Sequence, residues 1–261
     1  MRVPVILAAV LATLCASGAQ RSDGASASAK PLLILERTDG ATRAEGLLAR
    51  RLAVYPDGSV LSASTLPEFG RGQLEPAQIS ALTELVSRAR LADLPAIVES
   101  RADWFDLGDA SSALRWSGDD AAEVRVAGDL RADAADRALA PHGFVEVLEF
   151  IDSIPISESK EALEGDAVVE FTLEPWTRSD TSPFEAIVDV EPRAWPSGLT
   201  APRGHTARAQ GGAARDLAQC AREGRPVTWA GKSWRVRGQT LFPFEVARPR
   251  SARSEDAPQP G

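Results

Sequence analysis

The histidine and cysteine residues are the first candidates for chemistry, because the chain has so few of them. It contains two histidines, His142 and His205, and two cysteines, Cys15 and Cys220. Cys220 and His205 could act as a thiol nucleophile and its general base if the fold brought them together. No third group that would orient the imidazole is evident, and Cys220 lies in an apolar helical pattern typical of a buried thiol. We therefore predict no catalytic residue, with the thiol pair as the alternative.

Motifs for metals, phosphates and acyl transfer do not occur in the sequence. There is no HExxH, CxxC or G-x-S-x-G, and the two histidines do not have ligand spacing. The acidic clusters are Asp103, Asp106 and Asp109, and the pair Asp119 and Asp120. Calcium loops place ligands at every second residue, so a spacing of three predicts turns or solvated side chains instead. The sequence predicts no metal ligand and no cofactor.

The tryptophans are more informative than the titratable residues. Four of the six fall in the second half of the chain: Trp176, Trp195, Trp229 and Trp234. Trp229 and Trp234 lie on the two strands of a predicted hairpin, where they form either an aromatic platform for a sugar or peptide or part of the core. Trp195 lies between Pro192 and Pro196 in a predicted loop, and we take it as the candidate surface-binding residue.

The N-terminus has the three-part order of a secretory signal. Arg2 supplies a positive charge, an apolar run extends to Cys15, and small residues lead to Ala19. The run is too short to span a bilayer, which needs about 20 residues. We expect cleavage after Ala19, which makes the protein exported, either periplasmic or secreted. Lipid attachment at Cys15 is the alternative, although Leu14 fits a lipoprotein signal poorly.

The composition is that of a globular protein. The chain is 44% hydrophobic and 25% charged, with a formal net charge of −8. An acidic chain lacks the basic footprint that phosphate backbones require, so nucleic acid is not an expected partner. No segment after the signal is long and apolar enough to predict a transmembrane helix. With Cys15 removed, Cys220 has no partner for an internal disulfide.

Hydrophobic patterns divide the mature chain into two blocks after a linker at residues 20–30. The first block covers residues 31–156. It contains a strand to Thr38 that ends in the turn pair Asp39-Gly40, and a hairpin around Pro56-Asp57-Gly58. A helix follows from Pro76, then a hairpin around residues 118–120, a loop over 129–140, and a closing helix over 141–153.

The second block covers residues 165–248 and is smaller, tryptophan-rich and mostly β. Strands are predicted over 167–173 and 184–190, a long loop over 192–212, and a helix over 213–222. A hairpin joins 227–229 to 233–236, and 241–246 is predicted as a last strand. The tail from residue 249 is polar and proline-rich and is predicted to be disordered. The fold class is therefore α+β, with two small domains that each combine an antiparallel sheet and helices.

The first block also resembles a known family. Its motifs are Leu35-Glu-Arg-Thr-Asp-Gly40, Leu52-Ala-Val-Tyr-Pro-Asp-Gly58, Leu74-Glu-Pro-Ala-Gln-Ile-Ser-Ala-Leu82 and the closing helix. In layout these resemble emfourin, a family of small proteins that inhibit thermolysin-like metalloproteases. The resemblance implies a protease-inhibitor-like module in exported bacterial proteins. The turn at Asp39-Gly40-Ala41 departs from the family pattern, and no binding residue is carried over.

Three functions are compatible with these patterns. The first is a non-enzymatic extracytoplasmic module that binds or inhibits another protein, and this is our prediction. The second is an exported hydrolase without a recognisable motif. The third is a structural or assembly protein of the cell envelope. Fold likeness alone does not separate them, because function depends on a site.

Overall fold

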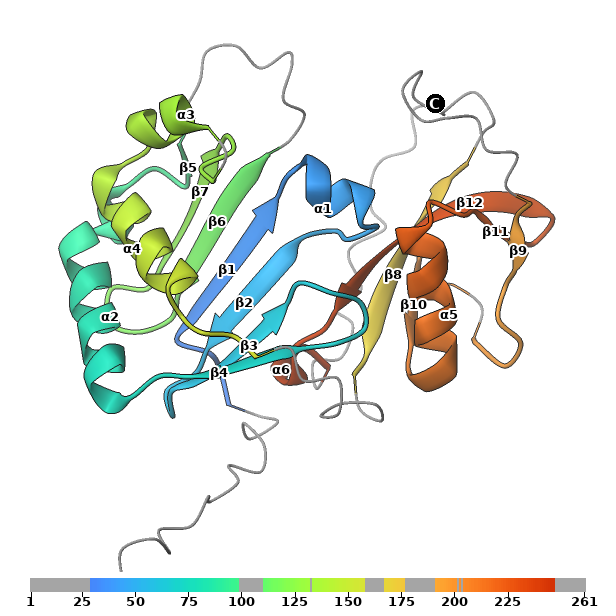
Figure 1. The fold of residues 1–261 in the computed structure, drawn as a ribbon, viewed down its shortest axis with the longest axis horizontal. Helices are drawn as coiled ribbons and strands as arrows, with labels where there is room; N and C mark the ends of the chain where they lie inside the picture. Colours follow the sequence, from blue (N-terminus) through green and yellow to red (C-terminus); the bar gives the residue numbers. More distant parts are fainter. Residues whose placement is uncertain are drawn as a thin grey trace, which may run out of the picture.

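The structure is a computed structural model that describes residues 29–98, 110–131, 133–157, 167–176, 191–200, 202 and 204–246 (Figure 1). Several expectations concern residues outside these ranges. They are the signal segment with Cys15 and Ala19, most of the linker, the acidic residues Asp103, Asp106 and Asp109, the strand over 184–190, and the tail from 249.

The first half of the described chain forms a seven-stranded sheet with the spatial order β4-β3-β2-β1-β6-β7-β5. Its strands are β1 (Leu33–Thr38), β2 (Arg50–Val54), β3 (Ser59–Ala63), β4 (Gly70–Gln73), β5 (Ile97–Val98), β6 (Ser111–Trp116) and β7 (Ala122–Ala127). Neighbours are antiparallel except β5 and β7. Both predicted hairpins are present, β2–β3 and β6–β7. The first turns at Gly58, whose φ of +81° explains the need for glycine.

Two helices cover one face of this sheet, α2 (Pro76–Ala89) and α4 (His142–Asp152) (Figure 1). The Gln78 side chain accepts a hydrogen bond from the Glu75 N–H at 2.8 Å, which supports the start of α2 just before Pro76. Leu82, Val86, Phe144 and Val147 bury the apolar stripes of the two helices against β1, β6 and β7. The 3₁₀ turn η1 (Leu91–Asp93) follows α2, and α3 (Ala134–Leu139) precedes α4.

The second half of the described chain forms a five-stranded sheet with the order β10-β8-β12-β11-β9. Its strands are β8 (Val169–Pro175), β9 (Arg193–Ala194), β10 (Thr206–Ala209), β11 (Val227–Trp229) and β12 (Lys232–Thr240). The helix α5 (Gly211–Arg222) packs on one face, where Leu217, Ala218 and Cys220 are buried against Phe171 and Val236. The last element of the described chain is the short helix α6 (Pro243–Val246).

The two sheets pack against each other through an apolar contact. Phe242, which is 0% exposed, stacks on Phe69 with ring centroids 5.8 Å apart. Both belong to a cluster of buried residues from the two halves: Ile34, Ala53, Tyr55, Leu61, Ala63, Phe69, Ala167 and Phe242. Backbone hydrogen bonds add to it, because Leu48 N–H donates to Gly238 O at 3.0 Å and Gly238 N–H to Gly46 O at 2.9 Å. The segment at 46–48 thereby extends the second sheet alongside β12.

An ion-pair cluster at the same contact joins the sheets through Arg51. The Arg51 guanidinium donates to both oxygens of Glu245, at 2.5 and 2.8 Å, and its Nε donates to Glu36 at 2.9 Å. It lies 4.7 Å from the centre of the Phe242 ring. Burial alone would lower the pKa of Arg51, but hydrogen bonds and charges from Glu245 and Glu36 outweigh it and raise the pKa. Arg51 is therefore held charged in a site that excludes most water.

The structure confirms the α+β class, with two sheets that each carry helices. Four local expectations were wrong. The predicted turn at Asp39 opens into the helix α1 (Gly40–Ala44), and the predicted loop over 129–140 contains α3, which Asp133 caps. The predicted long loop over 192–212 contains β10, and the predicted last strand is α6, since Phe242 turns toward the first sheet. No helix in the described ranges is long and apolar enough to cross a membrane.

Candidate functional site

A row of rings crosses one end of the second sheet, and we call it the aromatic row. It consists of His205 just before β10, Trp234 on β12, Trp229 on β11 and Trp195 just after β9. The strands that carry these residues lie side by side, apart from β8 between the first two. The row therefore combines residues from distant parts of the second half into one surface.

The centre of the row is formed by Trp234 and Trp229. Their ring centroids are 6.2 Å apart, and the Trp234 indole Nε1 donates to the Trp229 carbonyl at 3.2 Å. The His205 ring lies on the other side of Trp234, with centroids 5.6 Å apart. Trp234 is 9% exposed, whereas Trp229 is half-buried and His205 is exposed. Trp234 thus anchors the row in the core, and the rings beside it reach the surface.

Trp195 extends the row to the edge of the sheet. Ala194 pairs with Thr228 in the parallel β9–β11 ladder, and the Trp195 backbone N–H donates to Thr228 O at 3.1 Å. Trp195 is therefore the strand neighbour of Trp229, on the face that α5 covers. Sequence reasoning expected Trp195 to be the exposed tryptophan, and the structure places it half-buried against the second core.

The indole N–H of Trp195 is one of the buried groups that have no hydrogen-bond partner in the described structure, as are the hydroxyls of Tyr55 and Thr240. Its Nε1 atom is buried, and no acceptor for it exists among the described residues. Burying an indole N–H without an acceptor costs about 1–3 kcal/mol of folding free energy, because the hydrogen bond to water is lost. Because this atom has almost no accessible surface, an acceptor from another molecule does not reach it in this conformation, and the exposed part of the Trp195 ring is what remains for contact.

The charged residues around the row differ in whether they form an ion pair. Lys232 pairs with Trp229 across the β11–β12 hairpin, is exposed, and forms no ion pair with a described residue. The carboxylate of Asp216 on α5 is held by Arg193 at 3.3 Å. Glu174 lies in register with Arg235, next to the Pro175–Trp234 pair, so strand alternation places it on the opposite face. Lys232 thus lies next to the row without an ion-pair partner among the described residues.

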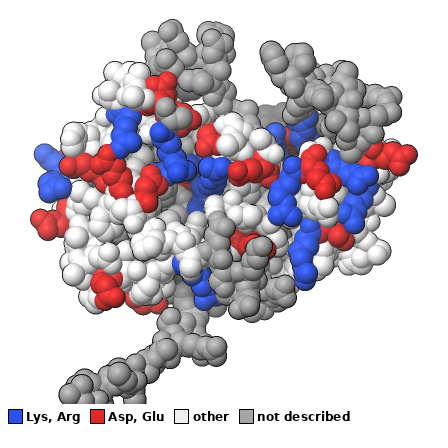
Figure 2. Space-filling model, in the orientation of Figure 1, with Lys and Arg blue, Asp and Glu red and all other residues white. Residues whose placement is uncertain are grey.

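Away from the aromatic row, basic and acidic side chains are interspersed on the surface that Figure 2 shows, across the visible face of both halves. Ion pairs among the described residues include Arg115 with Glu123 at 2.9 Å and Arg208 with Glu170 at 2.9 Å. No extended patch of one sign stands out on this face, so the chemistry of the aromatic row is the more specific local feature.

The structure does not bring Cys220 and His205, the alternative thiol pair, together as a catalytic unit. Cys220 is 1% exposed on the inner side of α5, whereas His205 is exposed and packs on Trp234. No hydrogen bond joins Cys220 to His205 in the described structure. Burial raises the pKa of the Cys220 thiol, and charge and hydrogen bonding from Arg193 offset this only in part. A thiol with a raised pKa is a weak nucleophile.

We expect Cys220 to react with a thiol reagent such as Ellman's reagent at least about a hundredfold more slowly in the folded protein than in guanidinium chloride. Burial and the raised pKa both reduce the accessible thiolate. An added small thiol serves as the exposed control in each buffer. Rapid, stoichiometric labelling of the folded protein would show that Cys220 is accessible. It would then again be a candidate nucleophile for the alternative hydrolase function.

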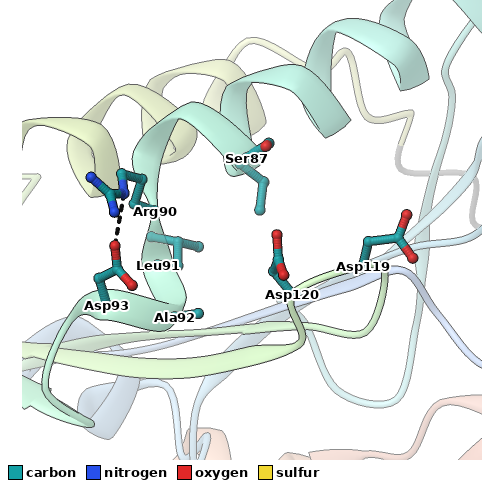
Figure 3. Close-up of a pocket in the computed structure, with 8 residues that line it drawn as sticks. Ser87, Arg90, Leu91, Ala92, Asp93, Asp119 and Asp120 are labelled. Atoms are coloured by element: carbon teal, nitrogen blue, oxygen red, sulfur yellow. Dashed lines mark ion pairs between the residues drawn. The ribbon is translucent and has the colours of Figure 1, made fainter.

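A small cleft lies between the end of α2 and the β6–β7 turn (Figure 3). Its volume is about 250 Å³, and its polar lining comes from Ser87, Arg90, Asp93, Asp119 and Asp120. Arg90 pairs with Asp93 at 2.7 Å, and Figure 3 shows Asp120 pointing toward the helix end while Asp119 turns aside. The turn predicted for these two aspartates is confirmed. The lining offers charges but no nucleophile paired with a base.

Metal-binding groups were not predicted, and the described residues show no cluster of three or more His, Cys, Asp or Glu side chains that could hold a metal ion. His142 begins α4, is exposed, and has its Nδ1 atom 3.7 Å from the Glu146 carboxylate on the next turn. This is the spacing of a helical i,i+4 pair on the surface.

Comparison with protein-family models, curated proteins and solved structures gave no match to this chain. The arrangement of its own residues is therefore the basis for a functional proposal. The sequence indicates Trp195 as a surface residue and His205 only as a candidate base, and it has no pattern that indicates Lys232. The hairpin over 227–236 was the one sequence signal that could have placed Lys232 beside Trp229.

Proposed function

We propose that this chain is a non-enzymatic, extracytoplasmic protein-binding module, and that Trp195 is the centre of its binding surface. The observation that carries the proposal is the half-buried Trp195 ring, which packs beside Trp229 on the second core and leaves part of its surface exposed. The signal peptide predicted at residues 1–19 is the basis for placing the protein outside the cytoplasm.

The physical support comes from how protein interfaces gain affinity. Tryptophan is enriched among the few residues that contribute most of the binding energy, especially where the ring is partly desolvated and surrounded by other apolar groups. Trp195 meets this description, since Trp229 and Leu199 pack beside it against the same core.

The proposal is tested by affinity capture from the envelope fraction of the source cells, with three immobilised proteins. Wild type and Trp176→Ala should retain the same envelope protein, and Trp195→Ala should lose it, with affinity reduced about tenfold or more. Trp176 is the matched control. Its N–H donates to Ser233 O at 3.1 Å, one residue beyond the Pro175–Trp234 pair, so alternation places it on the opposite face of the sheet.

The folding of each variant is checked by its unfolding midpoint before the capture is interpreted. Retention of the same proteins by all three columns would remove Trp195 from the proposal. Retention of no envelope protein by wild type would remove the protein-binding function itself.

The inhibitor form of the proposal is supported by the resemblance of residues 31–156 to emfourin, and it has its own test. Purified mature protein in excess is incubated with a thermolysin-like protease while cleavage of a small substrate is followed. A stoichiometric loss of protease activity supports an inhibitor. An unchanged rate rules out this form for the protease used, and the capture experiment then decides the wider binding function.

A further inference from the structure

We propose that the first half of the chain positions the binding surface around Trp195, through Leu66 and the segment at 46–48. This inference rests on the proposed protein-binding function and gives Leu66 a positioning role in it. It is drawn from contacts that cross between the two halves and continue, through α5, to β9, the strand just before Trp195.

The core of the second half is completed by two residues of the first half. Leu47 is 3% exposed and Leu66 is 1% exposed, and both are buried in the second core, on which Trp195 and Trp229 also pack. Leu66 packs directly on β12, because a Cβ added at Gly238 would be 2.8 Å from the Leu66 Cδ1 atom. The core behind the two tryptophans therefore depends on side chains that the first half supplies.

The same two segments of the first half hold the end of α5. The Arg222 side chain, in the last turn of α5, donates to the Leu66 carbonyl at 3.1 Å. Gly46 approaches the Ala221 backbone so closely that no side chain would fit between them. The connection between β3 and β4, which contains Leu66, extends from the first sheet toward the second half (Figure 1). The position of α5 is therefore fixed in part from the first half.

The helix α5 and the turn after it in turn hold β9, which has only two residues. The Arg193 side chain pairs with Asp216 on α5 at 3.3 Å, and the Arg193 N–H donates to the Pro226 carbonyl at 2.9 Å. Arg225, the residue before Pro226, donates its N–H to the Cys220 carbonyl on α5 at 2.8 Å. So short a strand has little stability of its own, and these contacts determine where the following tryptophan lies.

Hydrogen exchange of the full mature protein under native conditions measures this dependence. The N–H groups of Arg193 and Trp195 donate to Pro226 O and Thr228 O, so their exchange reports the opening of β9. Leu66→Ala leaves a cavity in the second core. It should accelerate exchange of both N–H groups about two- to thirtyfold, the range expected for residues that act through packed neighbours. The affinity for the captured envelope protein should fall with it.

Two variants separate positioning from a general loss of stability. Leu82→Ala removes the same side chain from the first core, where Leu82 is 0% exposed, and it should lower the unfolding midpoint by a similar amount. Because β9 lies at the end of the described sheet and opens locally, its exchange should stay at the wild-type rate in this variant. Leu66→Met nearly conserves the volume and should restore both the exchange rates and the capture affinity.

The outcomes distinguish the inference from the proposed function. Equal acceleration by Leu66→Ala and Leu82→Ala, or unchanged exchange in both, would overturn the inference. If Leu66→Ala does not fold, Leu66→Val gives the same comparison with a smaller expected effect. Capture that depends on Trp195 but not on Leu66 would leave the binding function standing and remove the positioning role. Faster exchange in Leu66→Ala, together with no capture by wild type, would confirm the contacts and remove the binding function.

Discussion

Replacing Arg51 with methionine is expected to lower the free energy of unfolding by about 3–5 kcal/mol, because it leaves a carboxylate at the contact between the sheets without its partner. The Arg51 side chain is 4% exposed and that of Glu245 is 21% exposed. Glu245 also accepts from the Phe242 N–H at 2.9 Å, so losing its ion pair would disturb the segment that docks α6 on the first sheet. Urea unfolding at neutral pH measures the change.

A double-mutant cycle separates the Arg51–Glu245 interaction from the general effect of removing charge. The cycle combines Arg51→Met with Glu245→Gln, and the matched control combines Arg115→Met with Glu123→Gln. Arg115 and Glu123 form a similar two-contact pair, at 2.9 and 3.1 Å, but their side chains are 45% and 60% exposed.

We expect a coupling energy of about 1.5 kcal/mol or more for the buried pair and about 0.2–1 kcal/mol for the exposed pair. The coupling in the buried pair should also be less sensitive to salt, since water and ions have little access to it. Equal coupling energies in the two cycles would show that the Arg51–Glu245 pair stabilises the contact between the sheets no more than an exposed ion pair would.

Gly46→Ala is expected to destabilise the protein by about 3–4 kcal/mol for a different reason. Gly46 has a φ of +71°, which opposes a side chain by about 1–2 kcal/mol. An added Cβ would also overlap the backbone carbonyl of Ala221, near the end of α5. Overpacking of this kind adds about 1–3 kcal/mol, because backbone atoms cannot turn aside as a flexible side chain can.

The matched control for Gly46 is Gly224, which follows the same helix. Its φ is +62°, so it has a similar backbone requirement, but an added Cβ would meet nothing within 4 Å. Gly224→Ala should therefore show only the backbone part of the loss, about 1–2 kcal/mol. Similar losses in the two variants would mean that the segment at 46–48 moves away from α5 easily, and that the contact between the sheets is less rigid than the structure indicates.

These two sites explain why the contact between the halves could not be predicted from the sequence. The Arg51–Glu245 pair joins residues 194 positions apart. Leu241–Val246 has an apolar pattern that suits a strand, and its helical end depends on Phe242 entering a cluster on the first sheet. Short apolar runs do not distinguish strand from helix, so tertiary contacts decide between them.

Elements with local signals were predicted well. The helix from Pro76 has its own starting residue and an apolar stripe with a period of 3.6, and the β2–β3 hairpin has a turn that needs only Pro56-Asp57-Gly58. The α3 helix was missed because Asp133, which accepts from the Ala135 and Asp136 N–H groups, begins a stretch too polar to show a stripe. A cap without a stripe is a weak signal.

The candidate site likewise has a part that the sequence predicts and a part that depends on the tertiary structure. The sequence by itself determined the α+β class, the principal helices and hairpins, and the choice of Trp195 as a residue worth attention, since these depend on residue type and short-range spacing. The tertiary structure decided what surrounds Trp195: Trp229 beside it, Lys232 one strand further, and no acceptor for its indole N–H among the described residues. The physical reason is that strand register and burial arise from packing between distant segments, which no local pattern encodes.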